Sequence, residues 1–220
     1  MEWDELKTRV WRGRGTTAAH AVLATGFQQL DSYLPGGGWP AGAITEIFVD
    51  GYGIGELELL MPAMASLTRP AQSSAKKWVA WVAPPFIPYA PALRQHGVDT
   101  ECLLMVHPAQ GNKSRLWAVE QTVRSGSSSG VLAWIAVADD VILRRLQLAA
   151  EDQSCWTVLF RPHSARQQRS PAALRIMLSQ YRAATRLQIL KCRGARPAVL
   201  DLERPLRAPR FKLAALEARS

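Results

Sequence analysis

Short apolar runs alternate with stretches of helical spacing along most of the chain. Residues 43–49 (AITEIFV) form the first run and read as a strand, and residues 131–137 (VLAWIAV) form the most apolar run, which we expect in the interior of a sheet. Strands that are apolar throughout and separated by helices are typical of a mostly parallel sheet covered on both faces. The pattern predicts an α/β fold with strands at 43–49, 77–83, 102–106, 131–137 and 155–160 and helices at 56–67, 89–96, 113–124 and 139–151.

The pattern changes after residue 160. Residues 161–170 are basic and polar without apolar periodicity, which predicts a mobile loop, and residues 171–180 are predicted as a helix. Residues 185–193 and 197–203 alternate apolar and polar positions, as expected of an antiparallel hairpin at the C-terminal edge of the sheet. We divide the chain into an N-terminal arm (1–23), one core domain (24–203) and a basic C-terminal tail (204–220).

Basic residues are concentrated in the last quarter of the chain. Residues 161–220 contain 14 Lys and Arg against 3 Asp and Glu, a net charge of +11, whereas the whole chain carries +9 and the first 160 residues therefore carry −2. A basic segment of this density suits nucleic acid, an acidic protein surface or an anionic membrane, and a solubilising surface is the plainer alternative.

Several classes of protein are disfavoured by the sequence. An apolar run of about 18 residues is absent, which predicts no membrane span, and the acidic first residues do not read as a signal peptide, so we expect a cytoplasmic protein. Cys102, Cys155 and Cys192 are widely separated, which predicts reduced, buried thiols. The four histidines have no ligand spacing, so we expect no metal site.

A glycine-rich turn follows the first predicted strand and precedes a predicted helix, which is the setting of a phosphate-binding loop. Aligned on Gly55, the turn has Glu56 where such a loop has its Lys, and Leu57 where it has the Ser or Thr that holds Mg²⁺. A carboxylate about 4 Å from a phosphate repels it by about 4 kcal/mol at an effective dielectric constant of about 20. We therefore expect no catalytic residue and no cofactor at this degenerate loop, which consists of Gly51, Gly53, Gly55, Glu56 and Leu57.

Motifs around the first predicted strand resemble the RecA family. Residues 25–31 (TGFQQLD), 36–42 (GGGWPAG) and 44–48 (ITEIF) are similar to the beginning of the RecA ATPase core. Residues 92–99 (ALRQHGVD) are similar to the segment that follows the second strand of that core. The resemblance spans roughly residues 24–203 and implies a RecA-like sheet, mostly parallel, with helices on both faces and an antiparallel hairpin at its C-terminal edge.

Three further motifs are similar to the ImuA family, which is RecA-like, lacks ATPase activity and is related to the SulA cell-division inhibitor. They are residues 11–14 (WRGR), 34–40 (LPGGGWP) and 50–57 (DGYGIGEL). The resemblance implies a non-catalytic adaptor of the SOS response to DNA damage. Such an adaptor supports error-prone translesion synthesis by binding ImuB and an error-prone polymerase, with RecA and single-stranded DNA as further partners. The alternative is a SulA-like inhibitor of cell division that binds FtsZ. The basic C-terminal quarter argues mildly against this alternative, because a DNA-related role uses that charge more naturally.

Candidate contact residues fall into two groups. Arg161, Arg166 and Arg169 lie in the predicted basic loop and are candidates for DNA binding, because flexible Arg-rich loops contact phosphates; a solvated surface and a protein contact are the alternatives. Tryptophans outside the predicted elements, and residues of the tail where cationic and apolar side chains mix, are candidates for partner binding. These are Trp3, Trp11, Trp39, Arg207, Arg210, Phe211 and Lys212, whereas Trp78, Trp81, Trp134 and Trp156 are predicted to be core residues.

Overall fold

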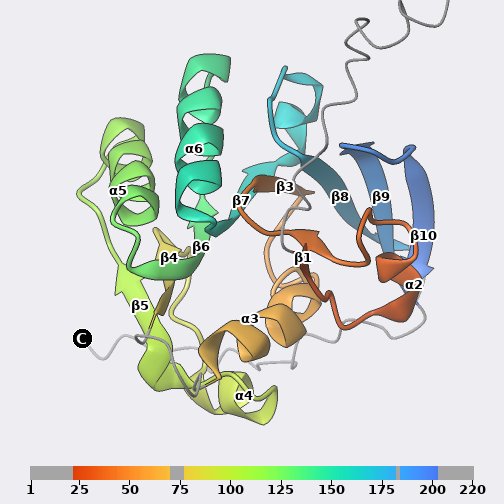
Figure 1. Cartoon of the computed structure of the whole chain (residues 1–220), viewed down its shortest axis with the longest axis horizontal. Helices are drawn as coiled ribbons and strands as arrows, with labels where there is room; N and C mark the ends of the chain where they lie inside the picture. The colour runs from red at the N-terminus through yellow and green to blue at the C-terminus, as the bar shows by residue number, and fades with distance from the viewer. Residues whose placement is uncertain (1–21, 70–76, 182–183, 203–220) are drawn as a thin grey trace, which may run out of the picture.

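The computed structural model of the chain describes residues 22–69, 77–181 and 184–202 (Figure 1). Within them the strands are β1 (Val22–Leu23), β2 (Trp39–Pro40), β3 (Ile44–Val49), β4 (Trp78–Val82), β5 (Leu103–Val106), β6 (Ser128–Trp134), β7 (Trp156–Pro162), β8 (Leu174–Tyr181), β9 (Ala184–Cys192) and β10 (Ala198–Leu202). The helices are α2 (Gln28–Asp31), α3 (Met61–Thr68), α4 (Ala90–Gln95), α5 (Asn112–Arg124) and α6 (Asp140–Gln153), with 3₁₀ turns η1 (Glu58–Leu60), η2 (Thr100–Cys102) and η3 (His163–Gln167).

One mixed sheet organises the molecule. Its strand order is β10-β9-β8-β3-β7-β6-β4-β5, and β1 pairs with β2 in a separate antiparallel ribbon. The strands from β8 to β5 in this order run parallel, and β9 and β10 extend the sheet by antiparallel pairing. The predicted α/β fold and the antiparallel hairpin at the C-terminal edge are confirmed.

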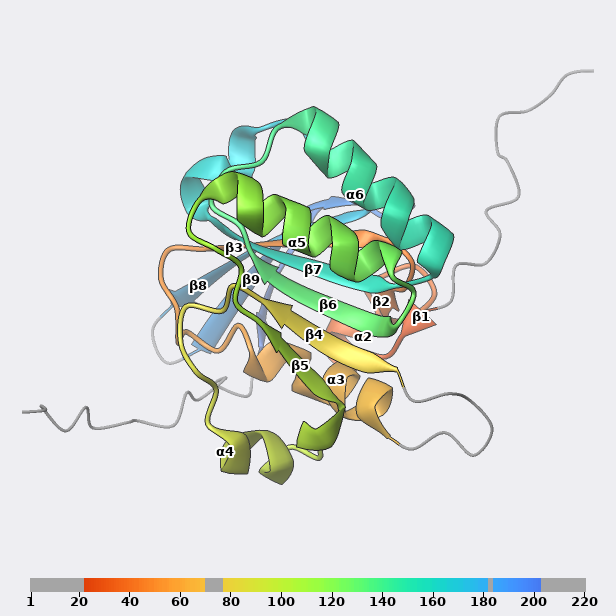
Figure 2. The same cartoon turned by 90° about the vertical axis from the view of Figure 1, so that its left-hand side faces the viewer.

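Helices cover both faces of the sheet, as predicted (Figure 2). On one face α5 and α6 pack against alternate side chains of β4, β6 and β7, and on the other face α2, α3 and α4 contribute to the larger of two buried apolar clusters. Because successive side chains of a strand point to opposite faces, the apolar strands supply both clusters at once. None of the helices in the described part of the chain is long and apolar enough to cross a membrane.

Local sequence signals set the starts of helices α6 and α3. The Asp139 carboxylate accepts a hydrogen bond from the Ile142 amide (2.8 Å) and caps α6, which begins one residue after the predicted start. The helix predicted from residue 56 begins instead as the 3₁₀ turn η1, and α3 starts around Pro62 because proline lacks the amide that a helix interior needs.

Two predictions for residues 161–180 are wrong. Arg161 belongs to β7 and is buried, and the residues that follow form the short turn η3 rather than a mobile loop. Residues 171–180, predicted as a helix, contain most of strand β8, whose side chains alternate: Leu174, Ile176 and Leu178 are buried in the larger cluster. The pairing of β8 with both β3 and β9 overrides the weak helical pattern.

Trp39 is also placed differently from the prediction of a partner contact. Its side chain is fully buried, and its ring lies 6.1 Å from that of Trp156, centroid to centroid. The preceding glycine explains the path of the chain, because a Cβ on Gly38 would lie 2.4 Å from the carbonyl oxygen of Leu23 in the neighbouring β1. Of the predicted core tryptophans, Trp81, Trp134 and Trp156 are buried and Trp78 is half-buried.

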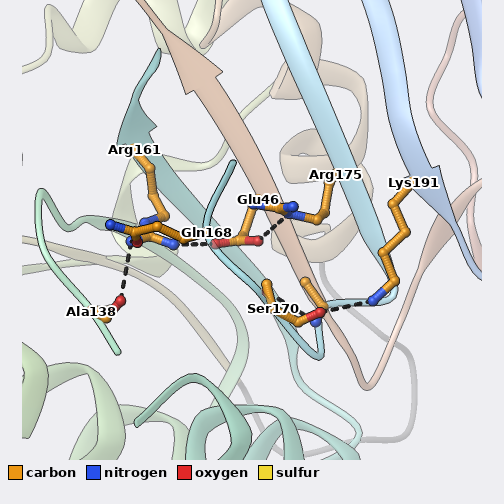
Figure 3. Close-up of polar contacts among 8 residues, drawn as sticks. Glu46, Ala138, Arg161, Gln168, Ser170, Arg175 and Lys191 are labelled. Carbon is orange, nitrogen blue, oxygen red and sulfur yellow. Dashed lines mark hydrogen bonds and ion pairs between the residues drawn. The ribbon is translucent and has the colours of Figure 1, made fainter. Parts of the chain in front are cut away.

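A buried carboxylate joins three neighbouring strands (Figure 3). Glu46 of β3 is completely buried, with Arg161 of β7 on one carboxylate oxygen (Nη1 to Oε1, 2.6 Å) and Arg175 of β8 on the other (Nε to Oε2, 2.7 Å). Arg161 also donates to the Gln168 side chain (2.7 Å) and to the Ala138 carbonyl (3.3 Å). Two guanidinium groups therefore compensate one carboxylate inside the fold.

The position of this ion triad follows from the connection between β7 and β8. These strands lie on either side of β3, so the chain must cross β3 between them, and here the connection contains η3 and an extended stretch rather than a long helix. Two residues of this connection accept hydrogen bonds from the sheet and form a polar network with the triad. The Gln168 side chain accepts from Arg161 of β7 (2.7 Å), and the Ser170 carbonyl accepts from Lys191 of β9 (2.8 Å). The polar network thus attaches the crossover to the sheet.

Replacing Glu46 should destabilise the fold strongly. Glu46→Gln leaves two buried guanidinium groups without a countercharge, and we expect the free energy of unfolding in urea to fall by about 3 kcal/mol or more. Asp201→Asn is the matched control, because it breaks the more exposed Arg186–Asp201 pair and should have a smaller effect. Equal losses for the two variants would contradict a structural role for the triad.

Candidate functional site: an internally occupied glycine turn beside an apolar groove

The glycine turn after β3 is occupied by a side chain of its own segment. The Glu56 carboxylate is buried and accepts hydrogen bonds from the Gly53 amide at both oxygens (2.8 and 3.0 Å) and from the Ile54 amide at Oε2 (2.9 Å). Gly53 has a φ of +81°, a conformation that glycine adopts without steric cost. Successive backbone amides in such a turn form an anion-binding concavity. Here the bound anion is the carboxylate of Glu56.

The negative charge of Glu56 contributes to the pKa of its neighbour Tyr52. Burial and then the negative charge of Glu56 raise the pKa of the Tyr52 phenol above its ordinary value, while Arg115 acts in the opposite direction. The phenol therefore stays protonated at neutral pH. Tyr52 is still 46% exposed, so it forms part of the rim of the site.

Contacts on both sides fix the position of the glycine turn. Asp50 lies 3.1 Å from His163 of η3 (Oδ1 to Nδ1), and the Gln180 side chain at the end of β8 donates to the Ile54 carbonyl (2.8 Å). The turn is thus tied to the ends of β7 and β8, the same strands that the buried Glu46 joins.

An apolar groove lies beside the turn at the carboxyl ends of the parallel strands. It has a cavity volume of about 590 Å³ and lies between the glycine turn, the segment after β4 and the start of α4. Trp81 and Trp134 line it from inside the fold, and Phe86, Ile87 and Tyr89 line its outer side. Ligands of open α/β sheets bind at this edge, in the crevice outside the carboxyl ends of the strands.

The outer side of the groove is unusually exposed for apolar side chains. Phe86 is 71% exposed and Ile87 is 90% exposed, and the Phe86 ring makes an edge-on contact with Tyr52 at 6.4 Å between centroids. Pro84, Pro85 and Pro88 restrict the backbone of this segment. Apolar groups held in this way on a stiff segment lose little entropy on binding and are typical of protein-interaction surfaces.

A second, more polar cavity continues from the groove. It has a volume of about 470 Å³, shares Tyr52, Pro85 and Trp134 with the groove, and is also lined by His107 and Arg115. The two cavities together form one concave edge that is apolar at one end and cationic at the other. Within the described residues, no group of three His, Cys, Asp or Glu side chains could hold a metal ion.

The three arginines predicted to bind DNA do not form one exposed group. Arg161 is 1% exposed and pairs with Glu46, so the prediction that it contacts DNA is wrong. Its positive charge compensates the buried Glu46 carboxylate instead. Arg166 is half-buried and donates to the His163 carbonyl (3.4 Å), and Arg169 is exposed. Contact of Arg166 and Arg169 with DNA stays a prediction.

The remaining predicted contact residues lie outside the described residues: Trp3, Trp11, Arg207, Arg210, Phe211 and Lys212. The sequence analysis did not identify Phe86 and Ile87 as contact residues. The prolines on both sides of them, Pro84, Pro85 and Pro88, indicate a stiff segment that cannot join a strand or helix.

The cysteines lie in or next to the interior of the fold. Cys102 and Cys155 are buried, as predicted, and Cys192 is half-buried. Burial raises the pKa of Cys155 to about 11, so this thiol stays protonated at neutral pH.

Comparisons with known proteins find similar solved structures but no matching sequence family. No protein-family model matches the sequence, and no curated protein matches it. Among solved structures, the crystal structure of SulA from Pseudomonas aeruginosa is similar at 24% sequence identity with a TM-score of 0.44, over 56% of this chain and 99% of that chain.

Removing the Glu56 side chain should convert the turn into a site for free anions. In Glu56→Gly the amides of Gly53 and Ile54 lose their acceptor, and we expect inorganic phosphate to raise the melting temperature of this variant but not of the wild type. At ten times its Kd, phosphate would add about 1.4 kcal/mol of stability.

The matched control for this experiment is Glu58→Gln, which neutralises another carboxylate lining the groove but leaves Glu56 in place. Phosphate should not stabilise this control. Equal stabilisation of wild type and Glu56→Gly would show that Glu56 does not block the turn.

Proposed function

We propose that this chain is a non-catalytic adaptor of the SOS response that supports error-prone translesion DNA synthesis, as its resemblance to the ImuA family implies. Its partners would be ImuB, an error-prone polymerase and RecA, and single-stranded DNA would be a further contact through the basic end. The ATPase-deficient, RecA-like character of the core is part of the same proposal.

One observation carries the proposal: the anion-binding turn is filled by Glu56 while the groove beside it exposes Phe86 and Ile87. A phosphate at this turn would have to displace a buried carboxylate that accepts hydrogen bonds from two backbone amides. An apolar groove at the same edge favours a protein partner, because exposed aromatic and aliphatic anchors dominate the energy of protein interfaces. The site therefore supports binding rather than phosphate chemistry.

Features of the sheet support the same reading. The mostly parallel sheet, the helices on both faces and the antiparallel hairpin at the C-terminal edge agree with what the resemblance implies for the core. The motif at residues 36–42 lies where a RecA-like core would begin, directly before β3, and the degenerate loop directly follows β3.

Separate pull-downs with ImuB, RecA and FtsZ test the proposed function. We expect capture of ImuB, and we expect Phe86→Asp with Ile87→Asp to weaken it about thirtyfold, which corresponds to about 2 kcal/mol at an interface anchor. Leu148→Asp, at an exposed position of α6, is the control and should leave capture unchanged. Capture of FtsZ alone would overturn the proposal in favour of the division-inhibitor alternative.

Hydrolysis of ATP should be absent. We expect phosphate release no faster than that of a mock preparation, with or without single-stranded DNA, because Glu56 and Leu57 stand where the catalytic Lys and the Mg²⁺-holding hydroxyl would be. DNA-stimulated turnover that disappears in Glu56→Gln would show that the carboxylate acts in catalysis.

A further inference from the structure

The apolar groove presents a large apolar surface that the described residues leave open. Ile87 and Phe86 are more exposed than any other large apolar side chains of the described chain, and Tyr89 beside them is 56% exposed. Apolar area of this kind on a soluble protein is normally covered by another chain or by a segment of the same chain.

The charges of the groove indicate the chemistry of what covers it. Among its lining residues the acidic side chains are Glu56 and Glu58, His96 is also present, and no Lys or Arg lines this part of the described molecule. A segment that combines apolar side chains with Lys or Arg would therefore match both the surface and the charge of the groove.

The C-terminal tail has this chemistry. Residues 204–220 contain 5 Lys and Arg against a single acidic residue, Glu217, a net charge of +4. The tail also contains large apolar residues interspersed with the cations: Leu206, Phe211, Leu213 and Leu216. An amphipathic segment of this type docks in apolar grooves.

The topology of the sheet brings the tail to the correct edge. Strand β10 is antiparallel to β9, which is antiparallel to β8, and β8 is parallel to β3, so β10 ends at the same edge of the sheet as β3. The described chain ends there at Leu202. The tail therefore begins on the edge that carries the glycine turn and the groove.

The length of the tail is sufficient to reach the groove. In the strand order β10 is six positions from β4, and six strand spacings amount to about 29 Å, more along a twisted sheet. The 18 residues after Leu202 span up to about 60 Å when extended, and Phe211 comes within reach at about 30 Å from Leu202. Leu206 reaches only the neighbourhood of β3, so Phe211 and Leu213 are the anchors that fit the segment after β4.

We infer that the C-terminal tail of this chain docks in its own groove, with Phe211 and Leu213 against Phe86 and Ile87 and with the arginines of the tail near Glu58. A protein partner that uses the groove must then displace the tail, so the tail regulates access to the site. This regulatory role rests on the proposed function, whereas the docking itself does not depend on which partner binds.

Photo-crosslinking of the isolated full-length protein tests the docking. A benzophenone amino acid at position 86 is irradiated in an equal mixture of ¹⁴N and ¹⁵N chains, and crosslinked peptides are identified by mass spectrometry. We expect links to peptides from residues 204–219 that carry the same isotope as the groove. The same probe in place of Trp117, a 64% exposed aromatic on α5, should give at least tenfold less of these links.

Tail variants make the result specific. Phe211→Asp with Leu213→Asp should reduce the position-86 links to the tail at least tenfold and should increase the capture of the partner by the groove. Ala214→Asp with Ala215→Asp adds the same charge to the tail without removing an anchor, and this control should retain most of the links.

Three results would overturn the inference: no tail peptide linked to position 86, equal links from position 117, or links of which about half join ¹⁴N to ¹⁵N chains, as random pairing of two chains in an equal mixture gives. The last result would assign the groove to the tail of a second copy. Failure of the proposed function would be seen separately, as tail links in the isolated protein without capture of ImuB.

Discussion

The arrangement of this fold depends on one buried carboxylate held between two guanidinium groups. Glu46 lies in the strand around which the sheet is organised, and its two partners come from the strands on either side, 115 and 129 residues away in sequence. A buried charge is tolerated only with its partners in place, so the triad requires β7, β3, β8 and the crossover between them to assemble together. The register of these strands relative to one another then fixes where each strand ends. It therefore also places the glycine turn in contact with His163 and Gln180.

The edge that results combines a closed anion site with an open apolar one. The Glu56 carboxylate satisfies the amides that would otherwise attract a phosphate, and the neighbouring groove displays Phe86 and Ile87 on a proline-stiffened segment. In other open α/β sheets this edge is a common location for phosphate binding, whereas here it exposes apolar side chains. This contrast is the physical basis of the proposed adaptor function.

Local signals in the sequence predicted much of the fold, and long-range contacts account for what they missed. Apolar runs and the Asp139 cap act within a few residues, so the strands from β3 to β7 and the start of α6 were predictable. Arg161 was misjudged because an arginine at the end of an apolar run resembles the start of a solvated loop, and its partner Glu46 is remote in sequence. Trp39 was misjudged because the two-residue strand that carries it has no periodicity. The degenerate turn was predictable from Glu56 and Leu57, whereas the exposure of Ile87 depends on how the segment after β4 leaves the sheet.

A ligand that belongs to the same chain behaves differently from one that diffuses. Because Glu56 lies next to the amides that it occupies, its effective concentration at the turn is fixed by covalent connection and does not follow the supply of any metabolite. A nucleotide-binding loop reports the energy state of the cell through exchange of its ligand, and a turn filled in this way has no ligand to exchange. Under the proposed adaptor function, nucleotide exchange at this turn does not set the output of the protein, which depends instead on how many copies are present and on access to the groove.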